Sequence, residues 1–161
     1  MDIIRSTTQP KATDWLEVDN ISGGDGSTTG TDLVISADIT LDFNDEMMQK
    51  PLEKVIIQVK FKHRLISGSG RCRANLNFTQ QNLFKTANDD IENGDSFKTQ
   101  AVQASTERER NIQIYPALIL GTTSTTINRY RIQVRASGEE DDDVWEVTEI
   151  KGRIVYLPLE V

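Results

Sequence analysis

Apolar and polar residues alternate along much of this chain, and residues 128–137 show the most regular alternation. Successive side chains of a β-strand point to opposite faces of its sheet, so a period of two predicts a half-buried strand. One face of this predicted strand is apolar and the other is basic. The apolar positions are Tyr130, Ile132, Val134 and Ala136, and the polar positions are Arg129, Arg131, Gln133 and Arg135.

Other segments repeat this design and predict further strands. Residues 54–66 and 71–79 are joined by the glycine-containing residues 67–70, which is typical of a β-hairpin. One helical turn, ended by Pro51, is expected within residues 45–54, and residues 81–87 are predicted to form a short helix. Pro116 places its strand at a sheet edge or a bulge, because proline donates no hydrogen bond to a neighbouring strand. The remaining predicted strands are 33–43, 96–104, 111–120, 144–150 and 153–159, and Gly152 separates the last two.

About eight strands joined by polar turns indicate an all-β sandwich or barrel. A chain of 161 residues is large enough to bury the core of one such domain. We place the β-sandwich domain at residues 32–161 and a partly irregular, extended N-terminal arm at residues 1–31. The apolar residues of the arm, which include Trp15, leave two alternatives. The arm either adds a first edge strand around residues 15–18 or orders against a neighbouring subunit.

Charge and composition exclude several classes of protein. The net charge of −7 argues against general nucleic-acid binding, which requires a basic surface. The single cysteine, Cys72, cannot form an intrachain disulfide, which fits a reducing compartment or an assembled particle. No apolar run reaches about 18 residues, so no membrane-spanning helix is expected. Residues 1–15 also lack the pattern of a secretory signal.

Residues that usually carry catalysis are scarce. His63, the single histidine, and Cys72 both alternate with apolar residues, so we interpret them as core or interface residues rather than as parts of a catalytic pair. The acidic segments 139–143 and 89–95 are interpreted as solvated loops, with calcium binding as the alternative. We therefore expect no enzymatic activity and no cofactor. A hydrolase with a pair of acidic residues is the remaining catalytic hypothesis.

Basic residues on the strand faces are the most informative functional signal in this acidic chain. The predicted hairpin sets Lys60, Lys62 and Arg64 opposite Arg71 and Arg73, and like charges directly opposite each other destabilise a sheet. The chain's own acidic residues, a neighbouring subunit or an anionic partner could neutralise them. The candidate interface residues are Trp15, Lys60, Lys62, Arg64, Arg71, Arg73, Arg129, Arg131, Arg135 and Trp145; Trp145 is interpreted as an anchor of the core or of a subunit contact rather than as a platform for sugars.

The C-terminal part of the chain resembles the jelly-roll modules of tailed-phage virion proteins, which share their architecture with the trimeric tumour-necrosis-factor and C1q-type heads. Such modules often finish with a Tyr-x-Ile/Leu-Gln-x-Arg strand, a turn that contains glycine, and a strand that closes in Ile/Val-x-Glu-Ile/Leu. This chain departs from that pattern in its acidic segment 139–143 and in a further strand beyond Ile150. The matching residues are Tyr130, Ile132, Gln133, Arg135, Gly138, Val147, Glu149 and Ile150.

The resemblance implies an antiparallel, jelly-roll-like β-sandwich that serves as a structural protein of a bacteriophage particle, either a capsid decoration (cement) protein or a tail component. It also implies a homo-oligomer, with a trimer favoured, that binds other virion proteins such as the major capsid protein. The expected location is the virion, after assembly in the host cytoplasm, with neither nucleic acid nor a membrane as partner. The alternative function is a carbohydrate- or receptor-binding module that uses loop acids and Trp15 or Trp145.

Overall fold

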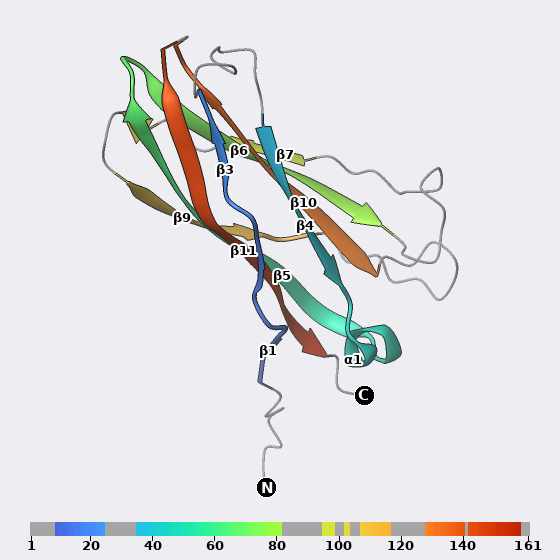
Figure 1. Ribbon diagram of the computed structural model, residues 1–161. Coiled ribbons are helices and arrows are strands. Elements are labelled where there is room, and N and C mark those ends of the chain that lie inside the picture. Colours follow the sequence, from blue (N-terminus) through green and yellow to red (C-terminus); the bar gives the residue numbers. More distant parts are fainter. Residues whose placement is uncertain are drawn as a thin grey trace, which may run out of the picture.

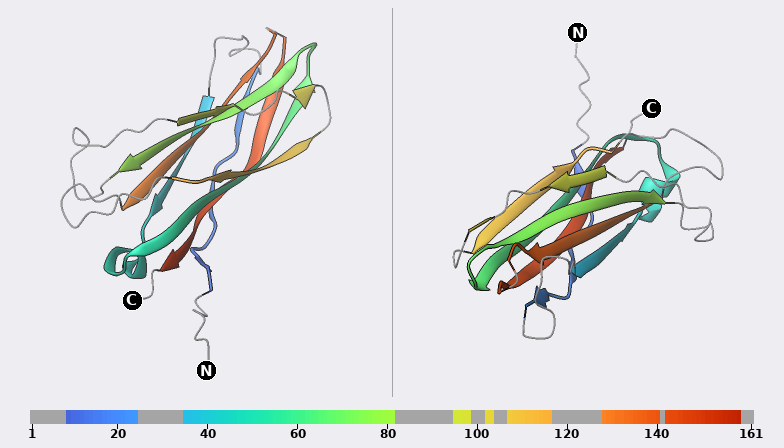
Figure 2. Two further views of the ribbon diagram at one scale, coloured as in Figure 1. Left: turned by 180° about the vertical axis from the view of Figure 1, so that it is seen from behind. Right: turned by 90° about the horizontal axis from the view of Figure 1, so that it is seen from above.

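The computed structural model describes residues 9–24, 35–81, 95–98, 102–103, 107–116, 128–140 and 142–158, which form two antiparallel β-sheets (Figure 1). The sheets face each other across one core, as the two views of Figure 2 show. Sheet A contains β1 (Lys11–Ala12), β2 (Leu16–Val18), β3 (Ile21–Gly23), β5 (Leu52–Ser67), β9 (Arg108–Ile114) and β11 (Val144–Pro158). Sheet B contains β4 (Ile35–Asp42), β6 (Arg71–Gln81), β7 (Asp95–Lys98), β8 (Val102–Gln103) and β10 (Arg129–Gly138).

The order of the strands defines the fold. β1, β2 and β3 follow one another along β11 and occupy one strand position, and β7 and β8 occupy another position beside β6. The eight positions, numbered along the chain, are then arranged 1-8-3-6 in sheet A and 2-7-4-5 in sheet B. This is the strand order of a jelly roll, which is built from two Greek keys around one core. The predicted all-β, jelly-roll-like sandwich is therefore confirmed.

β10 lies between β4 and β6 in the middle of sheet B, and its apolar face enters the core as predicted. Ile132 is fully buried, and the ring of Tyr130 packs against the rings of Phe43 and Phe78. The same alternation holds along β4 and β5, where every second residue is buried. The strand with the most regular pattern in the sequence is thus a central element of the core.

Helix α1 (Asp45–Gln49) confirms the helical turn expected after β4. Asn44 begins it, because the Asn44 Oδ1 accepts a hydrogen bond from the Met47 N–H at 2.8 Å. The Glu46 carboxylate accepts hydrogen bonds from the Lys11 Nζ at 2.7 Å and from the Tyr156 hydroxyl at 3.1 Å, so it joins the helix to β1 and β11. Among the described residues, no helix is long and apolar enough to cross a membrane.

The predicted hairpin between residues 54–66 and 71–79 is wrong. β5 belongs to sheet A and β6 to sheet B, and within the described residues the two strands form no ladder with each other. The glycine-containing turn instead carries the chain from one sheet to the other. A period of two predicts which side chains face the core, but it does not predict which strands pair. The basic residues of β5 and β6 consequently lie on opposite outer faces of the sandwich.

β11 is one continuous strand, and not the two strands predicted on either side of Gly152. Gly152 is buried and pairs with Val59 of β5, so the ladder continues through it. The irregularity lies earlier, where the register against β5 shifts between Thr148 and Lys151 and Glu149 adopts a left-handed φ of 52°. A bulge of this kind bends a strand without ending it.

β9 begins at Arg108, earlier than the predicted start at residue 111, so the charged residues before 111 belong to the sheet. β9 is an edge strand of sheet A and Pro116 follows its end, which confirms the predicted edge position. β7 begins one residue before the predicted strand 96–104, and β8 lies within it. Residues 82–94 and 117–127, which include most of the predicted helix 81–87, lie outside the described residues.

Part of the predicted arm forms an edge strand of sheet A, which is the first of the two alternatives. β1, β2 and β3 run antiparallel to β11 (Figure 1). Between β1 and β2, the Thr13 N–H donates to the Ile154 carbonyl at 2.9 Å, and the Thr13 Oγ1 accepts from the Ile154 N–H at 3.0 Å. The Asn20 Oδ1 accepts a hydrogen bond from the Glu149 N–H at the bulge, at 3.3 Å. Residues 1–8 and 25–31 lie outside the described residues.

A buried carboxylate at one end of the sandwich joins two turns. Asp143 is 2% exposed, although it belongs to the acidic segment interpreted as a solvated loop, so that interpretation is wrong for this residue. Its Oδ1 accepts a hydrogen bond from the Gly70 N–H at 2.8 Å. Its Oδ2 accepts from the N–H groups of Arg71, Glu139 and Glu140 at 2.8–3.1 Å. The carboxylate therefore holds the β5–β6 turn against the β10–β11 turn.

Glycine allows this close approach. Gly68 has a φ of 123°, which residues with a side chain rarely adopt, and a Cβ at this position would lie 2.3 Å from the Asp143 Oδ1. Both carboxylate oxygens of Asp143 face N–H donors, an environment that suits an anion and leaves no oxygen directed at a calcium ion. The other acidic segment considered for calcium, residues 89–95, lies almost wholly outside the described residues.

Replacing Asp143 with asparagine should destabilise the fold, because an amide NH2 group would face backbone N–H donors. We expect the free energy of unfolding to fall by about 3 kcal/mol, as when a buried charge loses its matched hydrogen bonds. Chemical denaturation followed by tryptophan fluorescence measures this change. Glu140→Gln removes the same charge from an exposed position of the same turn and should leave the midpoint unchanged. Equal midpoints for Asp143→Asn and the wild type would contradict the role of the carboxylate.

Candidate protein interface: a cationic cluster around Trp15

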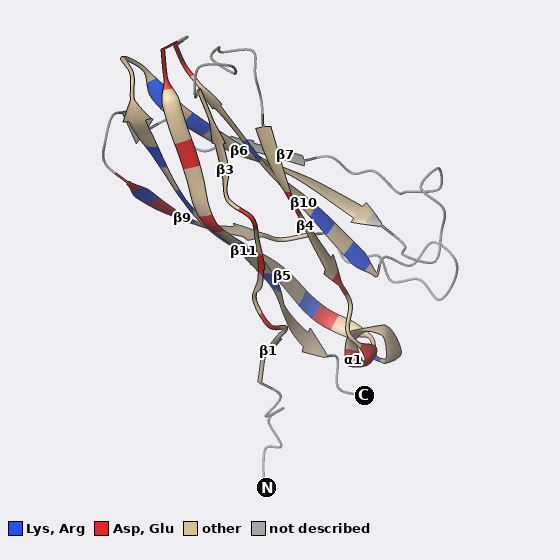
Figure 3. Cartoon of the chain, in the orientation of Figure 1, with Lys and Arg blue, Asp and Glu red and all other residues tan. Residues whose placement is uncertain are grey.

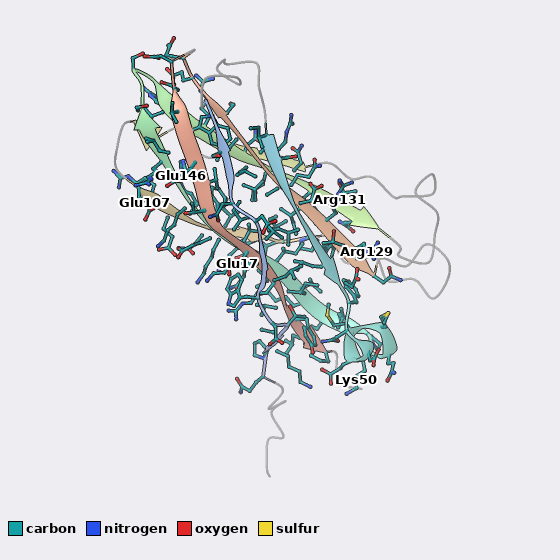
Figure 4. All side chains as sticks on the ribbon, viewed as in Figure 1. Glu17, Lys50, Glu107, Arg129, Arg131 and Glu146 are labelled. Carbon is teal, nitrogen blue, oxygen red and sulfur yellow. The ribbon has the colours of Figure 1, made fainter. Side chains whose placement is uncertain are left out.

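Most of the predicted interface cations are neutralised by the chain's own acidic residues (Figure 3). On the outer face of sheet B, the guanidinium groups of Arg129 and Arg131, labelled in Figure 4, bind the carboxylates of Asp42 and Asp38 at 2.5 and 3.1 Å. Self-neutralisation, one of the three explanations left open by the sequence, therefore applies to these residues. The other pairs are Arg71 and Arg73 with Glu139 at 3.6 and 3.5 Å, Lys62 with Glu149 at 2.7 Å, and Arg64 with Glu146.

Lys60 and Arg135 differ from the other predicted cations. Neither lies within 4.0 Å of a carboxylate in the part of the chain that the structure describes. Arg135 is flanked on sheet B by Ser36 and Asn75, which carry no charge. Lys60 instead has a cation as its direct neighbour, because its Cα partner across the β5–β11 ladder is Lys151.

This arrangement places two like charges directly opposite each other on the outer face of sheet A. Lys60 and Lys151 are both half-buried, so water screens their repulsion less than it would at a fully exposed site. Arg153 follows on the same face of β11, and its Nε donates a hydrogen bond to the Gln58 Oε1 at 2.7 Å. Three cations therefore gather where β5 and β11 pair.

The ring of Trp15 lies among these three cations. The distances to the ring centroid are 4.4 Å from the Arg153 Cζ, 4.9 Å from the Lys60 Nζ and 5.6 Å from the Lys151 Nζ. Cations within about 6 Å of an indole ring are attracted by its negative face. We call Trp15, Lys60, Lys151 and Arg153 the Trp15 cluster. Trp15 reaches this place because the backbone of the arm is held along β11 on either side of it.

The described acidic residues on neighbouring strand positions form no ion pair with the cations of the Trp15 cluster. Glu17 of β2, labelled in Figure 4, is the Cα partner of Lys151 on the side away from Lys60, but no ion pair within 4.0 Å joins them. The Glu149 carboxylate binds Lys62 at 2.7 Å, and Lys151 attracts it more weakly, without an ion pair within 4.0 Å. Among the described residues, the three cations of the cluster thus contact the indole ring and Gln58, and no carboxylate lies within 4.0 Å of them.

The sequence predicted half of this cluster. Trp15 and Lys60 are predicted interface residues, and the structure brings them together. Lys151 and Arg153 were missed because Gly152 was interpreted as a break between two strands. The signal was present, since Lys151 and Arg153 alternate with the buried Ile150, Gly152 and Ile154. Trp145, by contrast, is 2% exposed and lies in the core, which is one of the two placements predicted for it from the sequence.

His63 and Cys72 are both buried in the core, as interpreted from the sequence. The His63 Nε2 accepts a hydrogen bond from the Arg110 Nε at 3.1 Å. Burial, together with the Arg110 charge, lowers the pKa of His63 to about 4, against an opposing effect of the Cys72 backbone. Burial and the Asp143 charge raise the pKa of the Cys72 thiol to about 12, so it stays protonated at neutral pH.

Neither residue supports a catalytic or metal site. A protonated, buried thiol is not a nucleophile, and the imidazole of His63 already accepts a hydrogen bond from a guanidinium group. Within the described ranges, no group of three or more His, Cys, Asp or Glu side chains is arranged to hold a metal ion.

Comparisons with known proteins give distant structural similarities only. No protein-family model and no curated protein sequence matches this chain. A chain of the T13 viral particle of infectious bursal disease virus has a TM-score of 0.48 at 11% identity, over 92% of this chain and 31% of that chain. A chain of the VP2 subviral particle of the same virus has a TM-score of 0.47 at 11% identity, over 93% of this chain and 33% of that chain. This chain spans about a third of the length of those chains.

The low pKa of His63 predicts a loss of stability in mild acid. The unfolded imidazole binds a proton below pH 6.5 and the folded one does so only near pH 4, so unfolding becomes more favourable as the pH falls between these values. We expect the free energy of unfolding to fall by about 2–3 kcal/mol across this window. Denaturation curves at a series of pH values measure it.

His63→Gln should flatten this pH dependence while lowering stability at pH 7, because glutamine does not titrate. If the wild type and His63→Gln lose stability in parallel between pH 6.5 and pH 4, His63 does not remain neutral in the folded protein.

Proposed function

We propose that this chain is a non-enzymatic structural subunit of a virus particle that binds neighbouring virion proteins through its outer strand faces. The Trp15 cluster is the observation that carries this proposal. It gathers three cations, none of which has a carboxylate within 4.0 Å among the described residues, on an outer face of a chain whose net charge is −7. Protein interfaces complement charge between their two sides and are enriched in tryptophan and arginine.

The fold and the C-terminal resemblance support the virion setting of this proposal. The jelly roll is a frequent architecture of viral capsid domains. The residues of the resemblance lie on the strands that pair on both sides, Tyr130 and Ile132 on β10 and Val147 and Ile150 on β11. We propose a bacteriophage capsid decoration protein or tail component, assembled in the host cytoplasm, that forms a homo-oligomer, with a trimer favoured, and binds the major capsid protein.

Two observations favour a protein partner over the other classes. Six of the eight predicted interface cations bind the chain's own carboxylates, which leaves no extended basic surface for nucleic acid among the described residues. A sugar platform requires an open aromatic face, but Trp145 is buried and cations lie over the ring of Trp15. The carbohydrate-binding alternative therefore lacks both of its aromatic candidates.

Purified virus particles provide the test of this proposal. We expect mass spectrometry of gradient-purified particles from the infected host to detect this chain, and the signal to survive a wash that removes adsorbed host proteins. Sedimentation velocity of the isolated protein should give an oligomer, with a trimer as the expected species. A strictly monomeric protein that is absent from washed particles would contradict the proposal.

A further inference from the structure

We infer that the Trp15 cluster binds an acidic segment of a neighbouring protein, with one carboxylate over the Lys60–Lys151 pair and a second at Arg153. This inference rests on the proposed function and names the chemistry of the partner. It starts from an unfavourable feature of the isolated chain. Like charges directly opposite each other in a ladder are destabilising, and neither ammonium group of this pair has a carboxylate within 4.0 Å among the described residues.

The next outward-facing cation on the same strand has a carboxylate partner, unlike Lys60. Lys62 lies two residues beyond Lys60 on the same face of β5, and the Glu149 carboxylate binds it at 2.7 Å. The hydrogen bond to Glu149, together with electrostatic attraction to its carboxylate, raises the pKa of Lys62. The sheet thus provides a carboxylate for Lys62 but a second ammonium group for Lys60. An external carboxylate placed over Lys60 and Lys151 would remove this difference.

The groups of the cluster are held in place before any partner arrives. The Arg153 guanidinium is fixed by its hydrogen bond to Gln58 and by the face of Trp15, and its other N–H groups can bind both oxygens of a carboxylate. The indole ring of Trp15 adds apolar surface beside the cations. A segment with a carboxylate and an apolar residue would therefore match the surface in charge and in polarity.

The size of the site favours a short acidic segment over a long polyanion. The three cations lie within two adjacent strands, and the acidic residues Glu17, Glu146 and Glu149 lie on β2 and β11 of the same sheet. A nucleic acid or a sulfated polysaccharide that extends beyond the cluster would meet these carboxylates and the net charge of −7. A segment with two or three carboxylates would not extend so far.

Binding of a fluorescein-labelled hexaglutamate peptide to the isolated protein at low salt tests this inference. Lys60→Glu should weaken binding about tenfold, because one attractive charge contact becomes repulsive. Lys54→Glu is the matched control: Lys54 is an exposed residue of β5 at an even position like Lys60, and it lies outside the cluster. The affinity of Lys54→Glu for the peptide should stay within about twofold of the wild-type affinity.

Thermal unfolding distinguishes a binding site from a cluster that only holds the N-terminal arm against sheet A. Lys60→Glu places a carboxylate opposite Lys151, so it should raise the unfolding midpoint by about 1–2 °C while it weakens peptide binding. A fall in the midpoint, or equal losses of affinity in Lys60→Glu and Lys54→Glu, would overturn the inference. So would absence of hexaglutamate binding, or tighter, Lys60-dependent binding of a heparin oligosaccharide.

The two proposals fail in different ways. Peptide binding is measured on the isolated protein, so it does not depend on whether the chain occurs in particles. If particles contain the chain and incorporate Lys60→Glu as well as the wild type, the inference is overturned and the proposed function stands. If washed particles lack the chain while hexaglutamate binding remains Lys60-dependent, the proposed function is overturned and the acidic-segment site stands.

Discussion

The pairing of β11 on both of its edges is the interaction on which the rest of this structure depends. On one edge β11 forms a long ladder with β5, and on the other it pairs with β1, β2 and β3 in turn. The position of the arm is set by its pairing with β11 and by Val18 and Ile21, which pack against the core. Because of this position Trp15 lies over the outward side chains of β5 and β11, and the cationic cluster exists.

Charge is organised differently inside and outside the sandwich. Inside, the Asp143 carboxylate is surrounded by backbone N–H donors and holds two turns together, so a buried negative charge contributes to the fold. Outside, strand cations such as Arg129 and Arg131 have a carboxylate on a neighbouring strand, and exposed pairs of this kind contribute little to stability. The Trp15 cluster combines cations with an indole ring instead. An acidic partner that binds there would neutralise these cations.

Period-two alternation predicted the strands and the buried face of each, as Tyr130 and Ile132 on β10 illustrate. It could not predict pairing, because β5 and β6 have equally good patterns whether they form a hairpin or belong to opposite sheets. The acidic run 139–143 gave no sign that Asp143 is buried, since its hydrogen-bond donors come from the conformation of two turns. Half of the candidate site was missed because Gly152 resembles a strand break in the sequence, although it is a buried position within β11.

The central claim is that the Trp15 cluster contacts a carboxylate of another chain, and zero-length cross-linking of intact particles tests it most directly. A carbodiimide joins ammonium and carboxylate groups that are in contact, and mass spectrometry identifies the linked residues. The account predicts links from Lys60 or Lys151 to an aspartate or glutamate of a neighbouring chain, beside internal links such as Lys62–Glu149 and Lys11–Glu46. Particles that yield these internal links, but none from Lys60 or Lys151 to another chain, would contradict it.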